Sequence, residues 1–174
     1  VLMLAAAWFL SGRLPDSTLF LRLLLSIGLP VIVAAAVLLS RVSRRDLRLL
    51  MAVLAGILLL LRLIWFPVET TDYTDFLRPW ANWYHAHGGL QALGRNVGNY
   101  NVPYLVFLAL FSYWDVPVLY PIKLLSTVFD LVLAISLSRI VILLTDSEKR
   151  GAAVFLLVLA LPTLFIYLSL CVKC

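Results

Sequence analysis

The sequence predicts an all-α protein, a polytopic bundle of four to five transmembrane helices with short juxtamembrane helices in its first large outer loop. Three observations favour this fold class. Hydrophobic residues make up 63% of the 174 positions, whereas soluble domains are about half apolar. The apolar residues gather in stretches close to the about 20 residues that a spanning helix needs. The basic residues cluster between those stretches, as they do in the cytoplasmic loops of membrane proteins.

Four apolar stretches are long enough to cross a bilayer. They are residues 23–40, 49–66, 116–140 and 151–172. Residues 1–10 resemble the end of a further membrane helix rather than a signal peptide, because they lack a positively charged start. The absence of an internal repeat or low-complexity tract favours one membrane domain over residues 1–174.

Two short basic loops orient the predicted bundle. Residues 41–48 (RVSRRDLR) and residues 146–150 (DSEKR) connect predicted spans. Both loops should lie in the cytoplasm, because cytoplasmic loops carry an excess of Lys and Arg. The segment 67–117 then lies outside, and its low content of basic residues, Arg78 and Arg95, agrees.

The outer segment should contain short helices. Thr70 or Thr71 can cap a helix that begins near Asp72 and that breaks at Gly88-Gly89. A loop rich in Gly and Asn follows, GRNVGNYNVPY. Residues 103–114 are apolar and aromatic but too short to span, so we expect a short helix at the outer membrane surface.

Two aspartates lie where the chain leaves the membrane. Asp72 and Asp75 are three positions apart, so on an α-helix both side chains can point to one face. Aromatic neighbours would exclude water there, and a carboxylate in that setting is suited to accept a proton from a hydroxyl group. Acidic residues also stabilise helix N-termini without any catalysis. Taken alone, the pair favours that structural role.

Three charged residues fall inside predicted spans. Arg62 and Lys123 lie near the outer ends of their helices, and Asp130 lies deeper. Such groups usually face a bundle interior or a cavity. For Asp130 we expect a structural pairing with another helix, for which Arg62 is a candidate. For Arg62 and Lys123, binding of a lipid phosphate and structural pairing remain open alternatives.

The remaining motifs indicate no cofactor. His85 and His87 are two positions apart, which places their rings on different faces of a helix, unlike the i, i+4 spacing that binds zinc. Cys171 and Cys174 form a single C-x-x-C pair with no partner pair. No metal ligands are therefore predicted, and dependence on a divalent metal stays open. The basic residues lack the pattern of a nucleic-acid site, so no nucleic-acid partner is expected.

The order of several motifs resembles the integral-membrane glycosyltransferases of the GT-C superfamily, closest to their bacterial mannosyltransferase-like branch. The motifs are TDY at 71–73, PW at 79–80, YNVPYLVFL at 100–108 and IKLLSTVFD at 122–130. The resemblance covers roughly residues 60–165. It implies a multi-pass protein of the bacterial plasma membrane.

Members of this family transfer a sugar, for which the mannosyltransferase-like branch suggests mannose, from a polyprenyl-phosphate donor to an acceptor on the non-cytoplasmic face. The resemblance implies that Asp72 is the base and Asp75 a supporting carboxylate. It also suggests substrate contacts for the motif residues Tyr73, Trp80 and Tyr104. Position in the sequence adds Arg62, Asn101 and Lys123 as candidates to hold the lipid phosphate or a sugar. Membrane lipid and the donor are the expected partners, and the acceptor is open.

The sequence departs from the family pattern at two places. Val102 replaces the first proline of the usual pair. The outer-loop WGQxD motif expected near the end of the chain is absent, so we expect an N-terminal fragment of a longer enzyme. The alternative function is a non-enzymatic multi-pass transport or assembly subunit, in which the charged residues pair between helices and the aspartates cap a helix.

Overall fold

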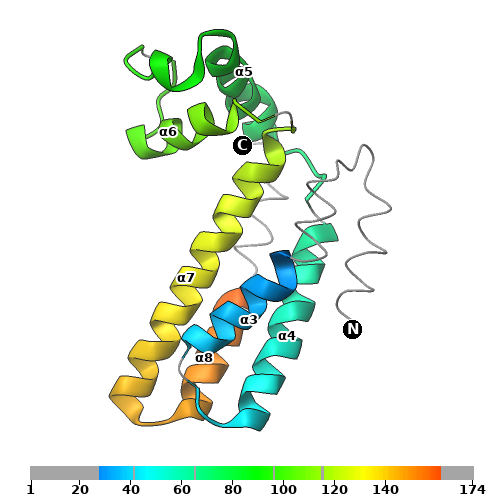
Figure 1. Ribbon diagram of the computed structural model, residues 1–174, viewed down its shortest axis with the longest axis vertical. Helices are drawn as coiled ribbons and strands as arrows, with labels where there is room; N and C mark the ends of the chain where they lie inside the picture. Colours follow the sequence, from blue (N-terminus) through cyan, green and yellow to red (C-terminus); the bar gives the residue numbers. More distant parts are fainter. Residues whose placement is uncertain (1–27, 41, 65, 96, 115, 162–174) are drawn as a thin grey trace. The chain divides into compact units, whose positions relative to one another are not determined.

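The computed structural model describes residues 28–40, 42–64, 66–95, 97–114 and 116–161 (Figure 1). All regular elements in these ranges are helices, which confirms the all-α prediction for this part of the chain. They are α3 (Leu29–Leu39), α4 (Arg45–Ile64), η2 (Tyr73–Leu77), α5 (Arg78–Ala86), η3 (Gly89–Ala92), α6 (Val102–Phe111), α7 (Leu119–Thr145) and α8 (Glu148–Ala160).

The described residues fall into two compact units. Residues 28–64 and 127–161 form the first, and residues 66–126 form the second. Helix α7 contributes its first two turns to the second unit and the rest of its length to the first.

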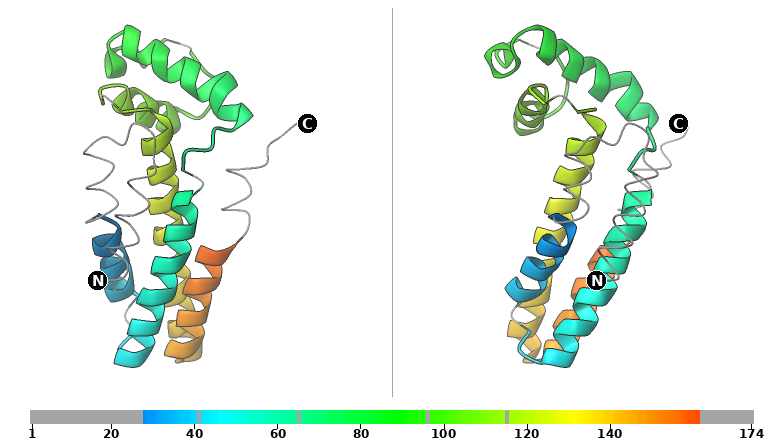
Figure 2. Two further views of the ribbon diagram at one scale, coloured as in Figure 1. Left: turned by 90° about the vertical axis from the view of Figure 1, so that its right-hand side faces the viewer. Right: turned by 45° about the vertical axis from the view of Figure 1, so that its right-hand side comes forward.

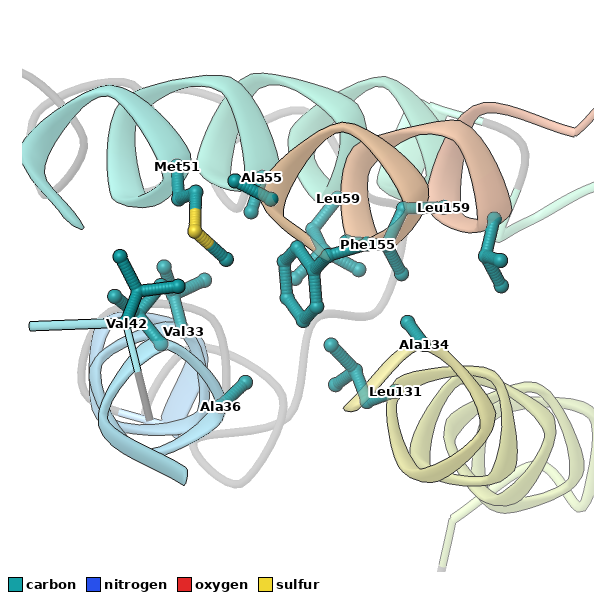
Figure 3. Close-up of a cluster of buried hydrophobic side chains, with 13 residues drawn as sticks. Val33, Ala36, Val42, Met51, Ala55, Leu59, Leu131, Ala134, Phe155 and Leu159 are labelled. Atoms are coloured by element: carbon teal, nitrogen blue, oxygen red, sulfur yellow. The ribbon is translucent and has the colours of Figure 1, made fainter. Parts of the chain in front are cut away.

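The first unit is a helical bundle in which α3 and α8 both pack against α4 (Figures 1 and 2). Met51, Ala55 and Leu59 of α4 are buried and spaced four positions apart, so they form one stripe along that helix. Phe155 of α8 is fully buried in the same cluster, which also includes Leu131 of α7 (Figure 3). This cluster is the core that joins the four helices.

The outward surface of the first unit is strongly apolar. Leu143 and Leu144 of α7 are 83% and 79% exposed, and α3, α4 and α8 also expose large apolar side chains. Among the described residues, α7 is the one helix whose length and composition suit it to cross a membrane, and only 17% of its most apolar stretch is buried. The core helix of a soluble protein would be mostly buried. An exposed apolar surface of this kind marks contact with a membrane or with other protein.

The prediction of four to five spans is not confirmed within the described residues, because α7 is the one helix there with the length and composition of a span. The predicted stretches also differ from the helices at their ends. Helix α4 begins within the predicted basic loop and therefore includes the charged residues Arg45, Asp46 and Arg48. Helix α7 continues to Thr145, five positions beyond the predicted end. The predictions for residues 1–10, 23–27 and 162–172 fall outside the described residues.

The second unit is a cluster of short helices around a core of its own. Tyr84 of α5 and Ala109 of α6 are fully buried there, together with Leu108 and Ala92. Pro103 lies in the first turn of α6, where a missing backbone N–H costs nothing. The short helix predicted over 103–114 is present as α6.

The predicted break at Gly88-Gly89 is confirmed. Both residues have positive φ, 84° and 61°; Gly88 lies between α5 and η3, and Gly89 is the first residue of η3. The Tyr113 hydroxyl donates to the Gly88 carbonyl at 2.8 Å and accepts from the Leu90 N–H at 3.0 Å. A Cβ on Gly89 would approach the Tyr113 ring to 2.5 Å, so the side chain that secures the turn also excludes a larger residue.

We expect Gly89→Ala to destabilise the second unit more than Gly88→Ala does. Both changes force alanine into a left-handed conformation, at about 1–2 kcal/mol. Only the Gly89 change also pushes against Tyr113, which adds about 1–3 kcal/mol of overpacking, whereas a Cβ on Gly88 meets the end of the flexible Gln91 side chain at 3.3 Å. Thermal unfolding of the two purified variants measures the difference, and equal losses would contradict the role of Tyr113.

Candidate functional site

A cavity of about 250 Å³ in the second unit brings together residues from three parts of the chain. Asp72 directly precedes η2, Tyr104 belongs to α6 and Lys123 to α7. Asp72 and Lys123 are thus neighbours across one cavity although 51 positions separate them in sequence. The described residues that line it are Thr70, Asp72, Tyr73, Leu77, Tyr100, Tyr104, Leu119, Ile122, Lys123 and Ser126.

Thr70 positions Asp72 by capping the helix that carries it. The Tyr73 N–H donates to the Thr70 hydroxyl at 3.3 Å, and the Thr74 N–H donates to the Thr70 carbonyl at 3.0 Å. Of the two threonines predicted as caps, Thr70 is therefore the one that acts. Because Asp72 follows the cap closely, it lies in the first turn, where the helix dipole stabilises a negative charge.

Tyr100 fixes the carboxylate of Asp72. Its hydroxyl donates to Oδ1 of Asp72 at 2.7 Å. The Tyr100 ring contacts Tyr104 edge-on, with ring centroids 5.3 Å apart. Asp72 therefore faces the cavity with one oxygen already bonded and beside two aromatic rings.

The two tyrosines that border Asp72 hold their protons unusually strongly. Burial, reinforced by the hydrogen bond to Asp72, raises the pKa of Tyr100 from 10.0 to about 12. Burial and the nearby charge of Asp72 raise the pKa of Tyr104 to about 12. Tyr100 therefore stays a hydrogen-bond donor at neutral pH.

These shifts predict a loss of stability in alkali. Below pH 10, both tyrosines are protonated in the folded and unfolded states. Their contribution to the free energy of unfolding is then fully present. Above pH 10, the unfolded chain releases these protons first, so the free energy of unfolding should fall until about pH 12. Unfolding measured against pH should show a smaller fall for Tyr104→Phe than for the unchanged protein. If tyrosinate absorbance of the folded protein showed that all tyrosines titrate with a pKa near 10, the raised pKa values of Tyr100 and Tyr104 would be contradicted.

Lys123 supplies the positive charge of the cavity. Its side chain is 2% exposed, and Nζ donates to the Val68 carbonyl at 2.6 Å. This bond ties the second turn of α7 to the segment that leads into the Asp72 helix. The ammonium group is thereby held at the cavity wall.

The two aspartates do not share the cavity, in contrast to the expectation of a common face. Asp72 lines it, whereas Asp75 is exposed and its Oδ1 accepts from the Thr74 hydroxyl at 3.1 Å. The reason is η2, in which the Arg78 N–H donates to the Tyr73 carbonyl across five positions. Such a π-helical turn holds more residues than an α-helical one, so residues three apart diverge. Such turns occur frequently at functional sites.

Two further predicted substrate contacts, Trp80 and Asn101, do not line the cavity. Trp80 contacts Tyr100 edge-on with ring centroids 5.1 Å apart, so it supports the tyrosine that bonds Asp72. Asn101 is exposed at the start of α6, and its backbone carbonyl accepts from the Tyr104 N–H at 2.9 Å. Tyr73 and Tyr104, the other two motif residues, do line the cavity.

Arg62 lies in the first unit and pairs with Asp130. The Arg62 guanidinium donates to Asp130 Oδ2 at 2.5 Å and to the Leu159 carbonyl at 3.2 Å. Arg62 is 5% exposed. The structural alternative for Arg62 and the pairing expected for Asp130 are therefore both observed, and the pair joins α4, α7 and α8.

Tyr100 and Ser126 line the cavity although neither is predicted from the sequence as a site residue. Tyr100 directly precedes Asn101 in the same motif and lies four positions before Tyr104. Its place in this motif could have indicated it as a site residue. Its hydrogen bond to Asp72, however, depends on how the loop before α6 folds back. Ser126 follows Lys123 by three positions, so it shares a face of α7.

The histidines hold separate backbone contacts. Nδ1 of His85 lies 2.7 Å from the Ser112 carbonyl oxygen, and Nδ1 of His87 lies 2.8 Å from that of Trp83. Within the described residues, no group of three or more His, Cys, Asp and Glu side chains is arranged to hold a metal ion. Cys171 and Cys174 lie outside the described residues.

Comparisons of the chain with models of protein families, with curated proteins and with solved structures find no match.

Proposed function

We propose that this chain belongs to a membrane glycosyltransferase of the GT-C type, or forms part of one, and that it acts on a polyprenyl-phosphate sugar donor. The observation that carries the proposal is the shared cavity of Asp72 and Lys123, one acidic and one basic residue from distant parts of the sequence. Tyr73 and Tyr104, which the family resemblance suggested independently, line the same cavity.

Asp72 and Lys123 carry the charges that sugar transfer needs at the acceptor hydroxyl and at the leaving phosphate. The acceptor hydroxyl would attack the anomeric carbon of the donor while its proton passes to the Asp72 carboxylate. The bond from that carbon to the phosphate oxygen would break, and the polyprenyl phosphate would leave with the bonding electrons. The Lys123 ammonium would neutralise the departing phosphate. Mannose is the sugar that the resemblance favours.

The proposed topology places four to five spans in a bacterial plasma membrane, with residues 41–48 and 146–150 in the cytoplasm and 67–117 outside. Two contacts support it. The Ser43 hydroxyl and the Arg44 N–H both donate to Glu148, at the start of α8. The two basic loops therefore lie at the same end of the first unit (Figure 2). The exposed apolar side chains of this unit also favour a lipid surrounding.

Single-cysteine labelling tests the topology. With Cys171 and Cys174 replaced by serine, Asn99→Cys should react with a membrane-impermeant maleimide in intact cells. Lys149→Cys should react only after the membrane is opened, because its loop lies in the cytoplasm. Both side chains are exposed, so access to the reagent and not burial decides the result. Labelling of Asn99→Cys only after lysis would refute the proposed site outside the membrane.

Donor binding tests the function. A photoreactive polyprenyl-phosphate mannose should crosslink to the chain in membranes, and an excess of unlabelled donor should prevent it. Lys123→Met should weaken crosslinking, because it removes the charge and keeps much of the apolar stem. Lys149→Met is the matched control and should crosslink as well as the unchanged chain. Equal crosslinking by all three would contradict the proposal.

One observation favours the alternative of a non-enzymatic membrane subunit. The Arg62–Asp130 pair joins helices, as that alternative expects for charges inside spans. The pair lies in the first unit, however, and does not account for Asp72 and Lys123 in the cavity of the second. Absence of donor crosslinking together with the expected cysteine topology would favour this alternative.

A further inference from the structure

A second cavity, of about 490 Å³, lies in the same unit as the first. Tyr73 is the one described residue that lines both cavities. The volume of this second cavity falls within the range of roughly 300–1,000 Å³ that is typical of pockets for small molecules. The lining is Glu69, Tyr73, Arg78, Ala81, Asn82, His85, Ser112, Trp114, Val116, Pro117 and Val118.

Among the described residues that line this cavity, the two charged ones neutralise each other. Arg78 forms an ion pair with Glu69, and its guanidinium also lies 5.0 Å from the centre of the Tyr73 ring. Both charged side chains remain more than two-fifths exposed, at 41% and 45%, so a ligand can reach their hydrogen-bonding atoms. Because the net charge of the pair is zero, the cavity favours a neutral ligand over an ion.

Asn82 and His85 add hydrogen-bonding groups of both kinds. They are three positions apart on α5 and therefore share a face. Nδ1 of His85 lies 2.7 Å from the Ser112 carbonyl oxygen. A carbonyl oxygen only accepts, so Nδ1 carries the proton, and in the neutral ring Nε2 is the acceptor. The Asn82 amide offers a donor and an acceptor.

An aromatic and apolar wall completes the cavity. The Trp114 ring is 46% exposed and tilts against Phe111, with ring centroids 5.3 Å apart. Val116, Pro117 and Val118 continue the apolar surface. A sugar ring presents C–H groups on its faces and hydroxyl groups around its rim, and each hydroxyl both donates and accepts. An aromatic face beside paired donors and acceptors is complementary to that chemistry.

We infer that this second cavity binds a neutral saccharide unit, with Trp114 against its C–H face and Asn82 and His85 at its hydroxyl groups. The inference is independent of sugar transfer, because it needs only binding. Asp72 and Lys123 do not line this cavity, so variants of those residues should leave the binding unchanged.

Nuclear magnetic resonance of the full chain in lipid nanodiscs tests the inference. The chain has 5 tryptophans, and the indole N–H signal of Trp114 is assigned as the one that Trp114→Phe removes. Methyl α-mannopyranoside and maltotriose are the neutral probes, and mannose 6-phosphate is the charged comparison. We expect a saturable shift of the Trp114 signal with at least one neutral probe.

Two amide variants separate the cavity from the rest of the surface. Asn82→Ala should weaken binding by about tenfold or more, which corresponds to about 1.4 kcal/mol. Gln91→Ala removes an exposed amide outside the cavity and should bind as the unchanged chain does. Asp72→Asn should also retain binding, so that failure of the transferase proposal is distinguished from failure of this one. No saturable shift with either neutral probe, equal weakening in both amide variants, or a preference for mannose 6-phosphate would overturn the inference.

Discussion

In membranes that transfer sugar from a polyprenyl-phosphate donor through this chain, Asp72→Asn is expected to lower the transfer rate by roughly 10²–10⁴-fold. The amide keeps the shape of the side chain, and its oxygen can still accept from the Tyr100 hydroxyl. In the unchanged protein this hydroxyl lies 2.7 Å from Oδ1 of Asp72. It cannot take a proton from the acceptor hydroxyl. Transfer of labelled mannose, measured at equal amounts of inserted protein, gives the effect.

Asp75→Asn is the matched control for this prediction. Asp75 lies three positions away and loses the same charge, but it is exposed and does not line the cavity. Its transfer rate should stay within a few-fold of the unchanged protein. Equal losses in the two variants, or full activity in Asp72→Asn, would remove Asp72 from the role of base.

Loss of the Asp130 carboxylate is expected to produce the largest fall in stability. Asp130→Ala leaves the Arg62 guanidinium buried without its carboxylate, and breaking a buried pair in this way costs about 3–5 kcal/mol. The Asp130 and Arg62 side chains are 15% and 4% exposed. The free energy of unfolding, measured by titration with a denaturing detergent, should fall by that amount. The yield of inserted protein should fall with it.

A double variant separates the cost of an orphaned charge from the loss of packing. Arg62→Met combined with Asp130→Leu removes both charges and retains apolar volume, and such replacements are often neutral or stabilising. The double variant should therefore be more stable than Asp130→Ala alone. A double variant as unstable as the single one would show that the pair contributes mainly by its geometry, through the link from Arg62 to the Leu159 carbonyl.

Local features of the sequence were sufficient to predict most helix ends in the second unit. The Thr70 cap, the break at Gly88-Gly89 and the helix that begins around Pro103 all depend on residues within a few positions of one another. Helix ends in the first unit were less accurate, because arginine is compatible with both a loop and a first helical turn. Helix α4 therefore begins at Arg45 inside the predicted loop.

The candidate site was predictable in its residue types but not in its assembly. The positions of Asp72, Tyr73, Tyr104 and Lys123 could each be proposed from a motif or from a charge near a membrane boundary. Asp75 could not be separated from Asp72, because the π-helical turn at Tyr73–Leu77 changes which residues share a face. No simple spacing of residues in the sequence predicts a π-helical turn.

By itself, the sequence determined that the described part of the chain is helical, where its apolar stretches lie and which caps and glycines bound the short helices of the second unit. These properties follow from interactions between residues close in the chain. Only the tertiary structure decided that Arg62 pairs with Asp130 and that Lys123 lines a cavity with Asp72. Those partners are more than 50 positions apart, and which distant side chains meet depends on how complete helices pack, which is a property of all their contacts together.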